Sequence, residues 1–219
     1  MLSVITTYLC FFAFTSSTGF TQDLKTEMLN EQQIEEIWGK FKSIKGGGNL
    51  LQSATQKGFS RMTGKEAGWG FKGIDQKGKP VLMCAWTFEP KNNKEKESCA
   101  MIMIQNGGKQ YLAYMTFPEN MKDLDDAKEW FANEQGEVQL AHSWHSCFRQ
   151  QLRNGSCSAR CQTNASHTYC YTRSFVEFYT FFGKVRLFNL NTYMACISVR
   201  CAADAACLLS VALGCGYSD

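Results

Sequence analysis

The chain has 219 residues, of which 44% are apolar and 20% are charged, and its formal net charge is +3. A chain of this length buries roughly 70% of its unfolded surface, enough to form a stable hydrophobic core without metal ions or disulfides. The composition excludes wholesale disorder. Beyond the N-terminus, no apolar run approaches the roughly 18 residues of a membrane-spanning helix.

The N-terminal segment has the character of an export signal. It carries no charged residue through Gln22, it is mostly apolar from Val4 to Phe14, and small residues follow at Ser16 to Gly19. We therefore expect residues 1–19 to be a signal peptide and the protein to be secreted. The alternative is an apolar helix that is retained as an anchor or packed in the core.

The cysteine count supports the same compartment. Loss of Cys10 with the signal peptide leaves ten of the eleven cysteines, and an even number in an oxidising compartment predicts five disulfides. The expected disulfide cysteines are Cys84, Cys99, Cys147, Cys157, Cys161, Cys170, Cys196, Cys201, Cys207 and Cys215.

Charge divides the chain into two regions. Residues 23–140 hold 16 basic and 17 acidic residues, whereas residues 141–219 hold seven basic and three acidic ones, and six of those seven are Arg. Cysteine density rises at the same point. These shifts predict a boundary near residues 136–146, with one domain at 20–140 and a cationic cysteine-rich domain at 141–219.

The first domain is expected to be α+β, with a helix, a four-stranded antiparallel meander and a second helix. Apolar residues at helical spacing predict a helix from Met28 to Lys45 that ends at Gly46–Gly48. Turn residues at 76–78 and 106–108 predict two hairpins between Gly68 and Phe117.

Two details complete this first domain. Asn120 is expected to cap a closing helix through Met121, Leu124, Ala127 and Phe131. A symmetric register around the polar connection at 90–96 places Cys84 opposite Cys99, which suggests a cross-strand disulfide.

The second domain is expected to be small, disulfide-rich and largely helical. Ser174 to Leu190 is rich in Phe, and its period fits either a strand or a buried helix, whereas Met194 to Leu213 favours a helix. Eight cysteines allow 105 pairings, and the sequence does not choose among them.

Patterns associated with catalysis or metal binding are weak. The run Gly68 to Gly73 fits G-x-G-x-x-G, but a hairpin follows it where a helix is needed to bind a pyrophosphate. His142, His145 and Cys147, with Cys157, have zinc-ligand chemistry but no usual structural spacing, and disulfides are the better interpretation of those thiols. We therefore predict no enzyme activity, no cofactor, no metal and no nucleic-acid partner. Asn154 and Asn164 lie in glycosylation sequons that matter only in a eukaryotic source.

Positive charge beside aromatic residues is the most informative feature of the second domain. Cationic charge attracts a protein to an anionic membrane surface, into which apolar residues then partition. The expected membrane-contact residues are Arg173, Phe175, Phe178, Phe181, Phe182, Lys184, Arg186 and Phe188. The alternative is that these apolar residues only fill the core of an extracellular module.

The layout resembles the precursors of halocin-type cysteine-rich bacteriocins, which carry an export signal, a modest N-terminal domain and a cysteine-dense C-terminal peptide. The similar parts are Lys65 to Phe117, especially Pro80 to Pro90 and Ala100 to Phe117, and the spacing of Cys147 to Cys215 with the Ala-rich Met194 to Gly214. The resemblance implies a released C-terminal toxin and an N-terminal domain that is a propeptide or immunity factor.

Two hypotheses follow. The first is a secreted antimicrobial or toxin-like protein whose C-terminal domain perturbs target membranes. The second is an uncut extracellular binding or inhibitor protein that acts on a protein partner. No dibasic pair is present, so release would require cleavage in the polar segment between Gly136 and Ser146.

Overall fold

The computed structural model describes residues 27–64, 67–74, 78–92, 96–122, 126–140, 163–181 and 183–200. The signal segment expected at 1–19 lies outside these residues. So do seven of the cysteines: Cys10, Cys147, Cys157, Cys161, Cys201, Cys207 and Cys215.

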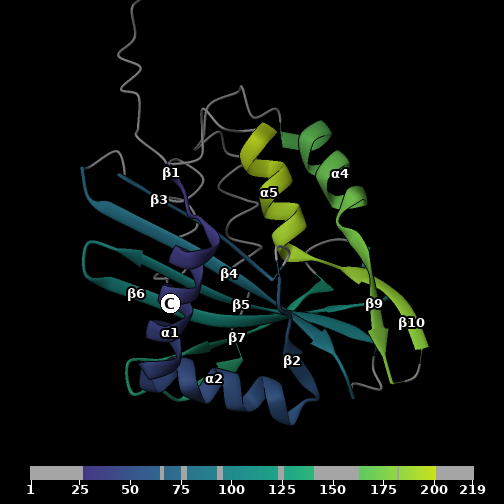
Figure 1. Cartoon of the computed structure of the whole chain (residues 1–219), viewed down its shortest axis with the longest axis horizontal. Helices are drawn as coiled ribbons and strands as arrows, with labels where there is room; N and C mark the ends of the chain where they lie inside the picture. The colour runs from purple at the N-terminus through teal and green to yellow at the C-terminus, as the bar shows by residue number, and fades with distance from the viewer. Residues whose placement is uncertain are drawn as a thin grey trace, which may run out of the picture.

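A large antiparallel sheet of eight strands forms the centre of the molecule (Figure 1). The strands follow the order β1-β3-β4-β5-β6-β7-β8, and β2 pairs with the far end of β4. Their bounds are Glu27–Met28 (β1), Phe59–Arg61 (β2), Gly68–Ile74 (β3), Pro80–Pro90 (β4), Glu97–Asn106 (β5), Lys109–Pro118 (β6), Lys128–Ala132 (β7) and Val138–Leu140 (β8).

Both faces of this sheet are covered. One face carries the helices α1 (Glu31–Ser43) and α2 (Lys45–Gln56), and the other carries α4 (Thr163–Arg173), α5 (Leu190–Arg200) and the base of a hairpin of β9 (Phe175–Thr180) and β10 (Gly183–Phe188). Along β4, Cys84, Trp86 and Phe88 face the first layer, whereas Met83 and Ala85 face the second. The sheet is therefore the middle of a three-layer structure, and its central strands are apolar on both sides.

The expected fold class, a helix–meander–helix domain followed by a largely helical domain, is wrong, because the described residues are mostly β and centre on one eight-stranded sheet. The four strands of the expected meander are present as β3 to β6, but further strands extend the sheet on both sides. The described part of the C-terminal region is also not an all-helical unit, because the β9–β10 hairpin separates α4 from α5. Apolar residues alternate there with a period of two: Phe178, Val185 and Leu187 point inward, while Glu177 and Arg186 are exposed.

The glycine run at 46–48 lies inside α2 and does not end the helical region. The break falls at Ile44, whose ψ of 131° is extended, and α2 begins directly after it. Gly46 and Gly47 are buried, and a Cβ at Gly46 would lie 2.7 Å from the Cβ of Ala132. Gly46 therefore allows α2 to approach the sheet closely, whereas Gly47 leaves room for the backbone of Phe41 in α1.

The closing helix expected after Asn120 is replaced by strand β7. Ala127 and Phe131 pack with the second layer, whereas Trp130 and Ala132 pack with the first. This alternation is typical of a strand buried on both faces. It was misread as a helical pattern because the spacing of four between Ala127 and Phe131 suits either period.

Candidate interaction surface

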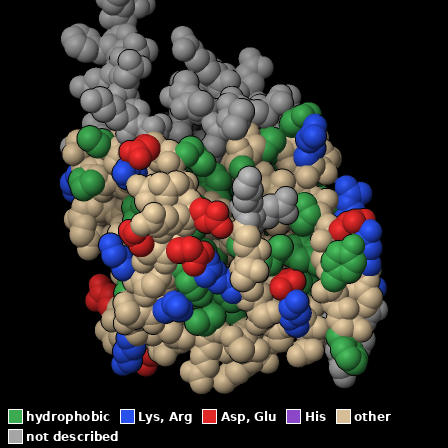
Figure 2. Space-filling view, in the orientation of Figure 1, with side chains coloured by type: hydrophobic (Ala, Val, Ile, Leu, Met, Phe, Trp, Pro, Cys, Tyr) green, Lys and Arg blue, Asp and Glu red, His purple; other side chains and the backbone are tan. Residues whose placement is uncertain are grey.

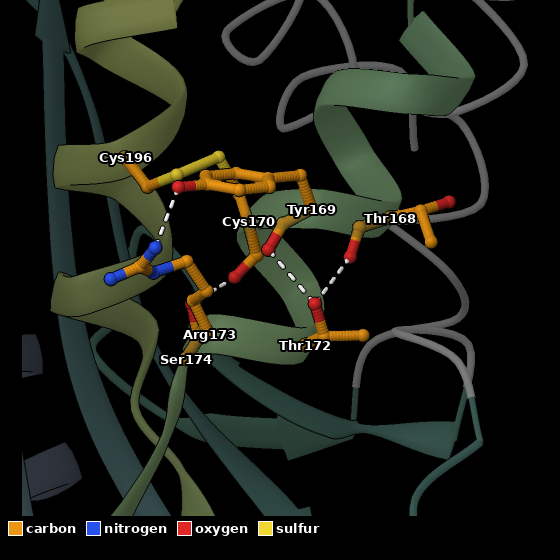
Figure 3. The surroundings of a disulfide bond; sticks show 7 residues. All are labelled: Thr168, Tyr169, Cys170, Thr172, Arg173, Ser174 and Cys196. Atoms are coloured by element: carbon orange, nitrogen blue, oxygen red, sulfur yellow. Dashed lines mark hydrogen bonds between the residues drawn. A yellow bond between two sulfur atoms is a disulfide. The ribbon is translucent and has the colours of Figure 1, made fainter.

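The described C-terminal residues form one unit that is closed by a disulfide. Cys170 of α4 is bonded to Cys196 of α5, with a Cα–Cα distance of 5.5 Å (Figure 3). Cys170 is fully buried, and the hydroxyl of Ser174 donates to its carbonyl at 2.5 Å. The bond joins the two helices that flank the hairpin, so it holds α4 and α5 together over the sheet.

Phe188 is the apolar centre of the contact between this unit and the sheet. It is fully buried, and its ring centroid lies 5.0 Å from that of Phe117 on β6. It also packs against Tyr171, Phe175 and Tyr193 of its own unit. Sheet and C-terminal residues thus share one hydrophobic cluster.

A buried polar seam fixes the start of α5 against β4. The side-chain oxygen of Asn189 accepts from the backbone N–H of Thr192 at 3.0 Å and from the hydroxyl of Thr87 at 3.4 Å. In its hydrogen-bonded orientation, the amide of Asn191 donates to the carbonyl of Ala85 at 3.3 Å. We did not predict this seam, although Asn189 three residues before Thr192 is a recognisable N-cap pattern.

The structure divides the expected membrane-contact residues into buried and exposed groups. Phe178 and Phe188 are 2% and 0% exposed, so neither side chain is available to a membrane in this folded state. Phe175 is half-buried in the same cluster as Phe188. Phe182 lies outside the described residues.

The exposed group lies on the hairpin and beside it. Phe181 at the hairpin tip is 85% exposed, and Tyr179 is 69% exposed. Arg173, Lys184 and Arg186 are also exposed. Figure 2 shows hydrophobic and basic side chains gathered along the edge of the molecule that β9 and β10 form.

Ion pairs and aromatic contacts hold these cations on the hairpin and the end of α4. The ammonium of Lys184 lies 2.6 Å from the carboxylate of Glu177, which raises the pKa of Lys184. The same ammonium lies 5.9 Å from the ring centroid of Tyr179. The guanidinium of Arg173 donates to the hydroxyl of Tyr169 at 2.6 Å.

The expected disulfide between Cys84 and Cys99 is wrong. Cys84 lies opposite Met103 and Cys99 opposite Phe88, so the two residues are four positions apart along the ladder, about 13 Å. A disulfide needs a Cα separation of roughly 5.5 Å. Both thiols are free and buried, and burial raises the pKa of Cys84 to about 12 and that of Cys99 well above its usual value. Neither is a reactive nucleophile at neutral pH.

Other candidate sites carry little chemistry. The glycine motif at 68–73 lies on β3, where a Cβ at Gly70 would come within 2.8 Å of the Cys84 sulfur, so its glycine serves close packing. An open groove of about 650 Å³ at the β3–β4 and β5–β6 turns includes Glu27 and Lys72, which pair at 3.1 Å. Within the described residues, no three metal-ligating side chains converge and no helix is long and apolar enough to cross a membrane. His142, His145 and Cys147 lie outside them.

Comparisons with protein-family models, with curated proteins and with solved structures find no match. The functional argument therefore rests on the cationic aromatic hairpin and on the buried contact between the C-terminal unit and the sheet.

Proposed function

We propose that the chain is a secreted, disulfide-containing antimicrobial or toxin-like precursor. In this proposal its cationic region at 141–219 perturbs anionic membranes, and the sheet of residues 27–140 holds that region until it is released. The observation that carries the proposal is the shared hydrophobic cluster, in which Phe188, Leu190 and Tyr193 of the C-terminal unit pack on the sheet.

The burial of these side chains would prevent a membrane-active region from inserting into membranes before its release. Apolar groups insert into a membrane only if they can leave the protein, since burial stabilises them by about 1.5–3 kcal/mol for each large side chain. Phe188 and Tyr193 are covered while the chain is intact, and they gain access to lipid when the C-terminal region leaves the sheet.

Composition supports an anionic target. The C-terminal region holds seven basic and three acidic residues, whereas residues 23–140 are close to neutral. Each Lys or Arg side chain close to an anionic membrane surface contributes about 1 kcal/mol to the free energy of binding. A released region would therefore favour membranes rich in anionic lipid.

One observation favours a second function, an uncut extracellular binding protein. Removal of the C-terminal unit would expose apolar residues of the sheet, including Phe71, Met83 and Ile102. Because the sheet needs this cover, the arrangement is equally consistent with a protein that is never cleaved. In that case the exposed hairpin would contact a protein partner.

Controlled cleavage separates the two functions. A protease recognition sequence is inserted between Leu140 and Thr163 of the full chain, and release of a trapped dye is followed from vesicles of phosphatidylglycerol and phosphatidylcholine. The matched control carries a scrambled insertion and receives the same protease. The precursor proposal predicts leakage only after specific cleavage, and only from the anionic vesicles. Cleaved protein that separates from the sheet and causes no leakage would contradict the proposal and favour the binding protein.

A further inference from the structure

The β9–β10 hairpin is a rigid element that presents an aromatic residue at its tip. Its inward side chains Phe178, Val185 and Leu187 are buried and pack with Met62 and Val176. At the tip, the N–H of Phe181 donates to the carbonyl of Lys91 at 3.2 Å. The tip is therefore fixed to the β4–β5 end of the sheet and is already in place before any binding.

The side chain of Phe181 is exposed in spite of this fixed backbone. It is 85% exposed, the highest value among the large hydrophobic side chains that the structure describes, and Tyr179 is 69% exposed. Phe178 on the same strand is 2% exposed. The hairpin thus contributes one of its faces to the core and directs two aromatic rings away from it.

The charges beside these rings define the kind of surface they suit. Arg173, Lys184 and Arg186 are exposed around the hairpin, and Glu177 is the acidic residue of β9 and β10. Among the described residues, Lys184 pairs with Glu177, while Arg186 donates through Nε to the carbonyl of Phe175 at 3.2 Å. Positive charge therefore remains around the exposed rings.

We propose that Phe181 and Tyr179, with Lys184 and Arg186, form an interfacial anchor by which the uncut protein binds an anionic lipid surface. This inference rests on the membrane target of the proposed function, and it adds a step that precedes release. Aromatic rings partition into the headgroup region, and adjacent Lys and Arg side chains keep their charges among the lipid phosphates. The buried apolar residues of the C-terminal unit are not needed for this step.

The test measures sedimentation of the full uncut chain with two kinds of vesicle, one of equal parts phosphatidylglycerol and phosphatidylcholine and one of phosphatidylcholine alone. We expect binding to the anionic vesicles that weakens as salt is raised, because the cations are exposed. Phe181→Ser should weaken that binding by about tenfold. Lys184→Gln should weaken it by about fivefold.

Ile74→Ser is the matched control, since Ile74 is a 44% exposed apolar residue that pairs with Pro80 at the start of β4, whereas the hairpin tip contacts Lys91 just beyond the other end of that strand. It should leave vesicle binding unchanged. Circular dichroism and the unfolding midpoint of Phe181→Ser show whether that variant remains folded, and Tyr179→Ser provides a second variant of the same surface. Equal weakening by Phe181→Ser and Ile74→Ser would overturn the inference, as would equal binding to both kinds of vesicle.

Failure of the anchor and failure of the proposed function give different results. Leakage by cleaved protein without binding by uncut protein contradicts the anchor alone. Binding by uncut protein without leakage after cleavage contradicts the proposed toxin and leaves the anchor supported. If uncut protein binds neither kind of vesicle, the anchor is wrong and the exposed rings are better explained by a protein partner.

Discussion

The two faces of the sheet are covered in different ways. The first cover, α1 and α2, packs entirely through non-covalent contacts in the part of the chain that the structure describes, with the rings of Trp38 and Phe41 tilted against that of Trp86. The second cover, α4 to α5, comes from residues 163–200 and adds a disulfide and a buried polar seam. The first layer thus belongs to the same stretch of chain as the sheet, whereas the second comes from a distant stretch.

This difference suggests that the two covers have different roles. The disulfide lies within the second cover and joins its two helices, so it does not bond that cover to the sheet. Departure of α4, the hairpin and α5 from the sheet would therefore not require the Cys170–Cys196 bond to break. Such an arrangement is what a releasable region requires.

Truncation of one large aromatic residue at the contact between the sheet and each cover gives the largest expected effects. Trp86→Ala and Phe188→Ala should each reduce the free energy of unfolding by about 3–5 kcal/mol, because each leaves a cavity at a fully buried site. Hydrogen exchange should show lost protection mainly in α1 and α2 for the first variant and mainly in 163–200 for the second. Loss of protection across the whole chain in both variants would contradict two separable covers.

Removal of the disulfide sharpens the comparison further. Cys170 and Cys196 are 26 residues apart, so replacing both by Ala should reduce stability by about 3.5 kcal/mol on the chain-entropy model. Urea unfolding measures the loss, and hydrogen exchange should locate it in α4 and α5. Cys84→Ala is the control, since it removes a free buried thiol from the sheet face beneath the first cover. A loss of protection in α1 and α2 equal to that in α4 and α5 would contradict this account.

Alkaline pH should weaken the contact between the sheet and the first cover, with a smaller effect per pH unit than either set of substitutions above. Burial raises the pKa of Cys84 from 9.0 to about 12 and that of Tyr114 from 10.0 to about 12. Below pH 9 both groups are protonated in the folded and the unfolded chain, and stability is unaffected. Between pH 9 and 12 the Cys84 thiol loses its proton only on unfolding, so stability falls by up to about 1.4 kcal/mol per pH unit for that group.

Urea midpoints measured across this range provide the check. Cys84→Ala should make the fall with pH shallower, because the variant has one fewer group that releases a proton on unfolding. An unchanged slope in Cys84→Ala would show that another group controls the alkaline transition.

Local sequence signals predicted the elements that depend on neighbouring residues. The turn at 106–108 is confirmed, with Asn106 opposite Lys109 and positive φ at Gly107 and Gly108. The helix ending at Ser43 is confirmed through most of its length, with its apolar face of Ile34, Ile37 and Phe41 buried. In both cases the residues that predict the element are the same residues that form it, or lie within a few positions of them.

The rest depended on contacts that local patterns do not contain. Position 46 of α2 is occupied by glycine because Ala132, distant in sequence, leaves no room there for a side chain. Phe188 looked like a candidate for membrane contact because the sequence does not reveal the second face of the sheet that buries it. The sequence likewise does not reveal the packing of Phe178 with its hairpin neighbours and Met62. The register that separates Cys84 from Cys99 is set by the whole β4–β5 ladder and not by the symmetry of its connection.

The intact mass of the secreted product, measured after alkylation with and without prior reduction, tests the central claim most directly. The account predicts a C-terminal fragment that begins between residues 136 and 146, whose eight cysteines are alkylated only after reduction. It also predicts an N-terminal fragment in which Cys84 and Cys99 are alkylated in denaturant without reduction. A secreted product that remains a single chain through residue 219, and is active in that form, would contradict the release of the C-terminal region.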